Sequence, residues 1–129
     1  MGVRCGLDLI ELNRIERAFS IHGDSFKSKV FTSNERAYCE GKGKASIQSY
    51  AARFCGKEAV AKALGTGIAK GVTLLDIEIT DVVGGKPVVT LYNEARHLYK
   101  AMGGTAMDIS LTHSRDYAAA QVVILISGD

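Results

Sequence analysis

The sequence has little proline, few cysteines and no long hydrophobic run, and each scarcity narrows what the chain can be. A single proline among 129 residues, with 47% hydrophobic and 23% charged residues, excludes disordered, collagen-like and low-complexity architectures. The longest uninterrupted apolar run, Val122 to Ile126, is far too short to span a membrane. Arg4, Asp8 and Glu11 interrupt the start, where a signal peptide would need its apolar region. We therefore expect one soluble, cytoplasmic domain over residues 1–129, without a membrane partner.

Cysteine usage and charge balance exclude two further classes. Cys5, Cys39 and Cys55 form neither a Cys-x-x-Cys pair nor a spaced set with histidine, so neither a zinc site nor a disulfide framework is indicated. Cys5 and Cys55 lie in apolar patterns, which favours small buried hydrophobes over nucleophiles. The formal net charge of +2 is too small to indicate a nucleic-acid partner. Any anionic ligand must therefore be bound by a local cluster of cations.

The first segment has the period of a half-buried strand. From Val3 to Leu9, apolar residues alternate with Arg4, Gly6 and Asp8. We therefore expect the apolar side of this strand to face the core and Asp8 to point away from it. Cys5 belongs to the apolar side.

Helical and strand signals then follow in an order that defines the fold class. Helices are expected over 12–19, from a capping box of Thr32 and Glu35 to a basic loop at 41–44, and over Ser46 to Leu64. The second half predicts a strand over Leu75 to Thr80, a glycine turn at 84–87 and a return strand over Val88 to Tyr92. A helix capped by Asn93 and strands over Met107 to Thr112 and Tyr117 to Ile126 follow. Because hairpins dominate, we expect an α+β domain with a mainly antiparallel sheet packed against the long helix.

Two carboxylates are candidates for chemistry. Glu58 lies in the apolar stripe of the long helix beside Phe54 and Cys55, where an ionised acid needs a metal, a cation or several donors. If Asp8 and Glu58 converge, their oxygens suit Mg²⁺, which takes one or two protein carboxylates and completes its shell with phosphate oxygens and water. The alternative is a salt bridge from Glu58 to Lys62 with Asp8 exposed, and spacing alone favours it.

Cations gather around Glu58 in the sequence. Those on its helix or just before it are Arg53, Lys57, Lys62, Lys42 and Lys44. Such a group suits a polyphosphate ligand that also carries a metal, although helices carry similar charges for solubility alone. The glycines before Lys86 either admit a ligand close to the backbone or form a plain hairpin turn. His113, at a strand end, faces either a cleft or the open surface.

Five segments, taken together, carry a resemblance to a known family. They are Gly6–Glu11, Arg53–Ala59, Gly65–Thr66–Gly67, Gly85–Lys86–Pro87 and Ser110–Ser114. In order and spacing they resemble the signature blocks of holo-acyl-carrier-protein synthase, the small bacterial type of 4'-phosphopantetheinyl transferase, over essentially the whole chain. One departure is Cys55-Gly56, where relatives commonly carry two alanines. Glycine within a helix costs about 1 kcal/mol relative to alanine, so we expect a locally weaker helix.

The resemblance implies a reaction, a metal and an assembly. The reaction is transfer of the phosphopantetheine arm of coenzyme A to a serine of apo-acyl carrier protein, in fatty acid biosynthesis, with release of adenosine 3',5'-bisphosphate. By the same resemblance, Asp8 and Glu58 bind Mg²⁺, Lys62 and His113 join them as catalytic candidates, and the protein is a homotrimer with active sites between subunits. The residues implied around coenzyme A are Arg53, Phe54, Lys57, Lys62, Gly65, Thr66, Gly67, Gly85, Lys86, Pro87, Thr112 and His113.

A partner surface and two alternative functions complete the expectations. Arg14 and Arg17 form a basic helix face shortly after Asp8, which would suit an acidic carrier protein, or they are solvated charges without a partner. A small acyl-coenzyme A thioesterase would bind the same cofactor, and metal dependence separates it from the transferase. A noncatalytic module that binds acyl carrier protein or nucleotides would leave a buried Glu58 without an evident purpose.

Overall fold

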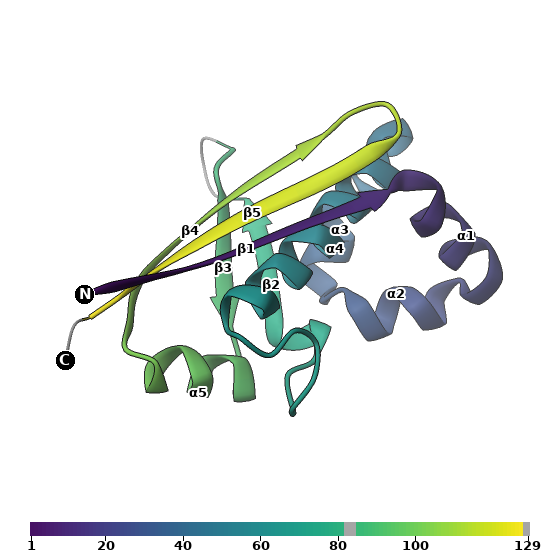
Figure 1. The fold of residues 1–129 in the computed structure, drawn as a ribbon. Helices are drawn as coiled ribbons and strands as arrows, with labels where there is room; N and C mark the ends of the chain where they lie inside the picture. The colour runs from purple at the N-terminus through teal and green to yellow at the C-terminus, as the bar shows by residue number, and fades with distance from the viewer. Residues whose placement is uncertain (82–84, 128–129) are drawn as a thin grey trace.

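Strand β5 (Tyr117–Ile126) is the centre of the main sheet. It pairs antiparallel with β1 (Gly2–Glu11) on one side and with β4 (Gly104–His113) on the other. A second sheet pairs β2 (Ile77–Asp81) with β3 (Pro87–Leu91), also antiparallel. In this computed structural model, which describes residues 1–81 and 85–127, the expected α+β fold with a mainly antiparallel sheet is confirmed (Figure 1).

Helix α4 (Ser46–Ala63) is the long helix, and it packs against the main sheet. Its buried side joins the inward residues of β5, such as Val122 and Ile124, to form the core. The other helices are α1 (Leu12–His22), α2 (Asp24–Val30), α3 (Ser33–Glu40) and α5 (Asn93–Ala101), with 3-10 turns at Gly43–Ala45 and Leu74–Asp76 (Figure 1). Within the described residues, none of these helices combines the length and hydrophobicity needed to cross a bilayer.

The observed helices and strands agree best with the expected ranges where the sequence pattern is long or where a capping motif marks the start. The capping box at the start of α3 is present, with Glu35 Oε1 accepting from Thr32 N at 2.9 Å. Helix α4 ends within one residue of its expected limit, and β5 has the expected range. Helix α2 was not expected, because its seven residues are too few to show a clear apolar stripe.

Three boundaries in the second half differ from expectation. Strand β2 begins at Ile77, because the preceding 3-10 turn already uses Leu74–Asp76. Helix α5 has Tyr92 as its N-cap, so the expected capping role of Asn93 is wrong; its Nδ2 instead donates to Asp76 Oδ1 at 2.9 Å. Strand β4 already begins at Gly104. Gly84 of the expected turn lies outside the described residues.

Strand β1 turns the opposite face to the core from the one that its alternation of apolar residues predicts. Leu7 and Leu9 are 65% and 63% exposed and Cys5 is exposed, whereas Gly6 is buried, so the expected burial of Cys5 is wrong. A Cβ on Gly6 would lie 1.9 Å from the carbonyl oxygen of Ala59 in α4. Only glycine lets the two backbones approach this closely. The inward face is therefore the one that contains Gly6 and Asp8.

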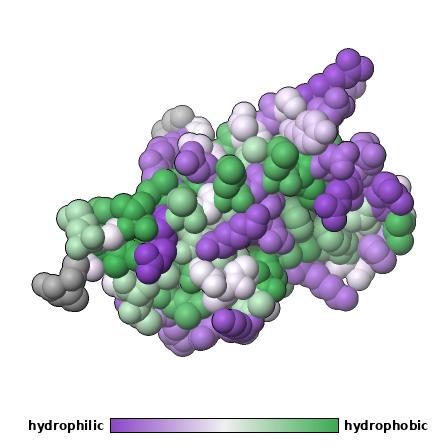
Figure 2. Space-filling view, viewed as in Figure 1, coloured by the Kyte–Doolittle hydropathy of each residue, from purple (hydrophilic) through white to green (hydrophobic). Residues whose placement is uncertain are grey.

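The outer face of the main sheet is apolar and uncovered in the single chain. Val3, Leu7 and Leu9 are exposed on β1, and Val123 and Leu125 are partly exposed on the neighbouring β5, where Leu125 pairs with Val3. Figure 2 shows hydrophobic side chains gathered over these strands, most densely near the start of β1. A contiguous apolar patch of this kind is typical of a protein interface.

Gly56 in α4 has a packing reason. A Cβ at this position would lie 2.3 Å from Ile79 Cδ1 in β2, and 3.2 Å and 3.3 Å from the side chains of Leu111 and Ile109 in β4. The glycine therefore lets the hairpin pack closely on α4. Any local loss of helix propensity is offset by this contact.

Candidate active site

Helix α4 presents candidate residues on two of its sides. Arg53 and Glu58 are separated by five positions, which places them roughly 140° apart around the helix axis. Each side faces a pocket of its own. The carboxylate pocket, of 300 Å³, is lined by Asp8, Glu58, Arg14, Phe54, Phe26 and neighbouring apolar residues. The cationic pocket, of 570 Å³, is lined by Arg53, Lys42, Lys86, His113, Tyr38, Asp81 and others.

Asp8 and Glu58 come together in the carboxylate pocket. Asp8 reaches it from β1 because Gly6 holds that strand against α4 and Asp8 shares its inward face. Burial raises the pKa of Glu58, the Asp8 carboxylate raises it further, and Lys62 opposes both effects. The proximity of a second carboxylate to Glu58 favours the binding of a cation between the two acids.

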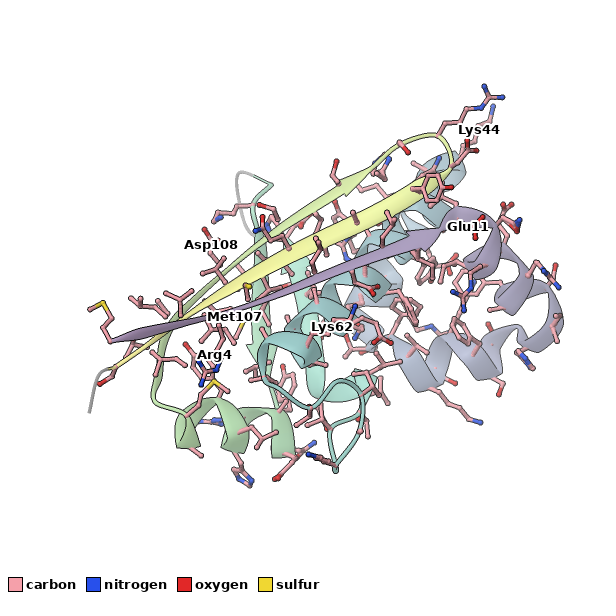
Figure 3. The ribbon with its side chains drawn as sticks, viewed as in Figure 1. Arg4, Glu11, Lys44, Lys62, Met107 and Asp108 are labelled. Carbon is pink, nitrogen blue, oxygen red and sulfur yellow. The ribbon has the colours of Figure 1, made fainter. Side chains whose placement is uncertain are left out.

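Lys62 forms its ion pair with Asp8. Its Nζ donates to Asp8 Oδ1 at 3.1 Å and to the carbonyl oxygen of Leu7 at 2.9 Å, beside the middle of β1 (Figure 3). No ion pair joins Glu58 to Lys62 in the part of the chain that the structure describes. The alternative of an exposed Asp8 and a Glu58–Lys62 bridge is therefore wrong, because the Asp8 side chain is only 17% exposed.

The donors of this pocket fit Mg²⁺. Carboxylate oxygens are the hard ligands that this ion prefers, and it commonly takes one or two of them from a protein. Among residues 1–81 and 85–127, no group of three or more His, Cys, Asp or Glu side chains is placed to hold a metal. Asp8 and Glu58 therefore suit an ion that completes its coordination with ligand oxygens and water.

Arg53 is the central residue of the cationic pocket. It is 4% exposed, its Nη1 lies 3.3 Å from Ser49 Oγ, and its Nη2 lies 3.3 Å from Asp81 Oδ1. The ring of Tyr38 lies against the guanidinium, with 4.1 Å from Cζ to the ring centroid. Within the described residues, Nε makes no hydrogen bond, and Nη2 makes only its ion pair with Asp81. A nearly buried guanidinium with unused donors is suited to binding an anion.

Further cations line the same pocket. Lys42 Nζ lies 4.6 Å from the Tyr38 ring centroid, and His113 stands at the end of β4. Lys86 Nζ lies 2.7 Å from Asp108 Oδ1, and this hydrogen bond lowers the pKa of Asp108. Gly85 and Pro87 form part of the wall beside Lys86. The pocket thus joins the expected Arg53, Lys86 and His113.

Other expected residues lie elsewhere. Phe54 lines the carboxylate pocket and stacks near Phe26, with 6.5 Å between ring centroids. Thr112 is exposed on β4. The segment 65–67 ends α4, and the amides of Thr66 and Gly67 donate to Ala61 O at 3.3 Å and 3.1 Å. The structure therefore does not gather all the expected coenzyme A residues in one pocket of one chain.

The two arginines of α1 have different surroundings. Arg14 lines the carboxylate pocket, beside both acids. Arg17 is exposed on the same helix. A partner docked on this face would therefore lie next to Asp8 and Glu58.

The position of Lys57 differs from the one that the resemblance implies. The side chain is fully buried and forms an ion pair with the equally buried Glu35, with 2.6 Å from Nζ to Oε1. Position 57 therefore faces the interior of the protein, and its ammonium group does not reach a ligand at the surface.

Three residues around Arg53 were not expected. Ser49 precedes Arg53 by one helical turn, and that spacing is the one signal that could have found it. Tyr38 on α3 and Asp81 on β2 meet the guanidinium only because the tertiary fold brings their elements to α4.

Comparison with known proteins identifies the family. A family model described as the 4'-phosphopantetheinyl transferase superfamily matches residues 4–122. The chain belongs to this superfamily. A holo-[acyl-carrier-protein] synthase of Ruminiclostridium cellulolyticum is 47% identical over 124 residues, which are 96% of this chain and 92% of the relative. One of Maridesulfovibrio salexigens is 41% identical over 124 residues, covering 96% and 98%.

Solved structures agree with this membership of the 4'-phosphopantetheinyl transferase superfamily. A holo-(acyl-carrier-protein) synthase of Bacillus anthracis in complex with CoA (3',5'-ADP) has a TM-score of 0.78 and 39% identity, covering 96% of both chains. The synthase of Helicobacter pylori in complex with coenzyme A has a TM-score of 0.81 and 30% identity, covering 94% of this chain and 99% of that one. The family resemblance and the expectation of an enzyme are confirmed.

Proposed function

We propose that this protein transfers the 4'-phosphopantetheine arm of coenzyme A to a serine hydroxyl of an apo-acyl carrier protein, with Mg²⁺, as a cytoplasmic step in fatty acid biosynthesis. The observation that carries the proposal is the pair of pockets on α4, one lined by two acids and one lined by Arg53, Lys42 and Lys86. A ligand with phosphate groups and a divalent metal meets both needs. The relatives that are holo-[acyl-carrier-protein] synthases, and the solved structures with coenzyme A, support the same reaction.

The cationic pocket binds and orients coenzyme A in this proposal. The Arg53 guanidinium attracts a phosphate group at the wall of this pocket, and Lys42 and Lys86 add positive charge. Tyr38 holds the guanidinium plane from one side. Fixing the phosphates in this way places the reacting phosphorus without a covalent enzyme intermediate.

The carboxylate pocket carries the chemistry. Asp8 and Glu58 would hold Mg²⁺, which supplies stabilisation of the charge that develops on the phosphate oxygens during attack. Lys62, paired to Asp8, adds a cation beside the same atoms. Asp8, Glu58 and His113 are the candidates to accept the serine proton. Arg14 and Arg17 hold the acidic carrier protein, so that its serine approaches the two acids.

We also propose that the active form is a homotrimer whose sites combine two subunits. The two pockets lie on different sides of α4, and the outer face of β1 and β5 is apolar and uncovered. Packing that face against a second copy would bury it and bring the carboxylate pocket of one subunit to the cationic pocket of the next. Sedimentation should give a trimer, and a fully active monomer would contradict this assembly.

The deciding experiment is incubation of the protein with coenzyme A, Mg²⁺ and an apo-acyl carrier protein, followed by mass spectrometry of the carrier. We expect the mass gain of phosphopantetheine and its loss when a chelator is added. A thioesterase would instead release free thiol from acyl-coenzyme A, without a mass gain on the carrier. A binding module would do neither.

Mixing two defective variants tests the shared site, at a coenzyme A concentration too low for Arg53→Met alone to give measurable transfer. Asp8→Ala damages only the carboxylate pocket, and Arg53→Met only the cationic pocket. If each site combines two subunits, trimers reassembled from both variants regain part of the activity. Complete inactivity of well-mixed trimers would show that each subunit holds a whole site.

A further inference from the structure

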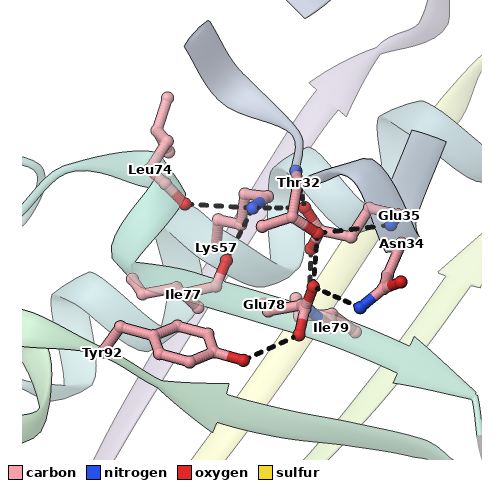
Figure 4. A network of polar contacts seen from close by, with 9 residues as sticks. All are labelled: Thr32, Asn34, Glu35, Lys57, Leu74, Ile77, Glu78, Ile79 and Tyr92. Atoms are coloured by element: carbon pink, nitrogen blue, oxygen red, sulfur yellow. Dashed lines mark hydrogen bonds and ion pairs between the residues drawn. The ribbon is translucent and has the colours of Figure 1, made fainter. Parts of the chain in front are cut away.

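Lys57 lies within a buried polar network that the proposed reaction does not use (Figure 4). Its Nζ lies 2.6 Å from Glu35 Oε1, 3.0 Å from the carbonyl oxygen of Leu74 and 2.6 Å from that of Ile77. Burial lowers the pKa of Lys57, and the Glu35 carboxylate opposes that shift. An ammonium group has three N–H donors, so these acceptors leave none for a ligand.

The acid partner is held from several sides. Glu35 Oε1 also accepts from Thr32 N at 2.9 Å, and Oε2 accepts from Ile79 N at 2.7 Å. Beside this pair, the carboxylate of Glu78 accepts hydrogen bonds from Thr32, Asn34 and Tyr92. The network therefore joins α3, α4 and the β2–β3 hairpin through bonds that have direction (Figure 4).

Stability alone gives little reason for a buried ion pair. Apolar residues of similar volume commonly replace such a pair without loss, and sometimes with a gain. Directional bonds to backbone carbonyls, however, add a constraint on register beyond the steric fit of apolar side chains. The two carbonyl contacts of Lys57 fix the point on α4 at which β2 begins.

Further contacts between β2 and α4 hold the two elements in the same alignment as far as the cationic pocket. Lys57 Nζ donates to the carbonyl oxygen of Ile77 at the start of the strand, and the side chain of Ile79 packs against Gly56. Arg53, one helical turn before Lys57, meets Asp81 at the end of the strand. Strand β2 thus runs along α4 from the buried pair to the guanidinium, and a shift at one end displaces the other.

We propose that Lys57 is a positioning residue for the binding of coenzyme A phosphates. Together with Glu35 it sets the register of β2 on α4, and this register places Asp81 and the adjoining end of β3 around Arg53. The inference rests on the proposed function. It means that affinity for coenzyme A depends on a side chain that touches no ligand.

The test replaces the pair with Lys57→Met/Glu35→Met, which keeps the volume and removes both buried charges. Val60→Ala is the control, because Val60 is buried on the same helix outside the network. Urea unfolding, the KM values of both substrates and amide hydrogen exchange of β2 are measured. We expect a loss of stability, because the amides of Thr32 and Ile79 lose their acceptor. We also expect a rise of about tenfold in the KM for coenzyme A, an unchanged KM for the carrier protein and faster exchange in β2.

The control and the outcomes separate positioning from simple stabilisation. Val60→Ala should lower stability and leave both KM values unchanged. A folded double variant with normal coenzyme A KM and normal β2 exchange would overturn the proposal. Should the double variant not fold, Glu35→Gln carries the same test, with a smaller rise expected and an unchanged KM overturning it. Absence of transfer by the wild type would refute the proposed function, whereas the exchange data would still decide the register.

Discussion

The two pockets of α4 have opposite charge deficits. In the carboxylate pocket, Lys62 forms an ion pair with Asp8. Burial and the nearby Asp8 carboxylate raise the pKa of Glu58. In the cationic pocket, Asp81 pairs with Arg53 Nη2, while Arg53 Nε makes no hydrogen bond within residues 1–81 and 85–127. The first pocket can take a further cation, and the second can take an anion. Under the proposed function, the two sides of one helix would bind the metal and the phosphate groups of the same kind of ligand.

Removing either acid should give the largest effect. Asp8→Ala and Glu58→Ala should each lower kcat/KM by about 100-fold or more, because a bound metal contributes several kcal/mol to the transition state. The fold should remain intact by circular dichroism. Glu11→Ala, an exposed acid on the same strand, is the control and should behave as wild type. Near-normal turnover in either pocket variant would remove Asp8 and Glu58 from metal binding.

Gly6→Ala should break the carboxylate pocket by a structural route. The added methyl would overlap the backbone carbonyl of Ala59, so urea unfolding should show a loss of about 3 kcal/mol. Gly2→Ala is the matched control, because its Cβ would meet only Ile126 Cβ at 3.9 Å. Equal stability of the two variants would refute the close strand–helix approach.

Arg53→Met should affect only the cationic pocket. Loss of charge-assisted hydrogen bonds of about 1.5–3 kcal/mol should raise the KM for coenzyme A roughly 10- to 100-fold, with the carrier KM unchanged. Arg36→Met, on the more exposed surface of α3, provides the control. An unchanged KM for coenzyme A would mean that the pocket binds another ligand.

Gly56→Ala probes the contact between the two sides. It should destabilise the protein by about 1–3 kcal/mol, because the new methyl would lie 2.3 Å from Ile79 Cδ1. In an Ile79→Val background that methyl contact is absent, so the same change should cost less, and a double-mutant cycle measures the difference. Additive costs would show that Ile79 does not require the glycine.

Charge reversal on α1 should have the smallest effect. Arg14→Glu and Arg17→Glu should raise the KM for carrier protein through surface pairs worth about 0.2–1 kcal/mol each, more for Arg14 because it lines the carboxylate pocket. The difference should shrink at high salt, and the KM for coenzyme A should not change. Unaltered carrier kinetics in both variants would remove this face from the mechanism.

The sequence pattern predicted the positions of the long helix and strand correctly, but it predicted the wrong buried face for β1. Helix α4 and strand β5 have patterns long enough for periodicity to place them. In β1 the apolar residues have the period of a core strand, yet the buried side is set by Gly6, because only that side can meet the backbone of α4. Alternation alone cannot show which face of a strand meets a helix and which meets another chain.

The candidate site was predictable in its residue types and not in its grouping. Spacing on a helix favoured a Glu58–Lys62 pair, but Lys62 reaches Asp8 on a distant strand. Lys57 and Arg53 lie one turn apart with similar charge, and only the tertiary fold distinguishes them, since Glu35 neutralises the first. Local sequence contains no signal for such long-range partners.

The inverted β1 also gives the protein a thiol that differs chemically from its two others. Cys39 and Cys55 are fully buried, and burial raises the pKa of Cys55 to about 12, so both resist alkylation in the native fold. Cys5 stands on the open apolar face, where a second copy would shield it. Its rate of reaction with a maleimide should therefore fall as protein concentration rises. The reactivity of this one native side chain would then report self-association.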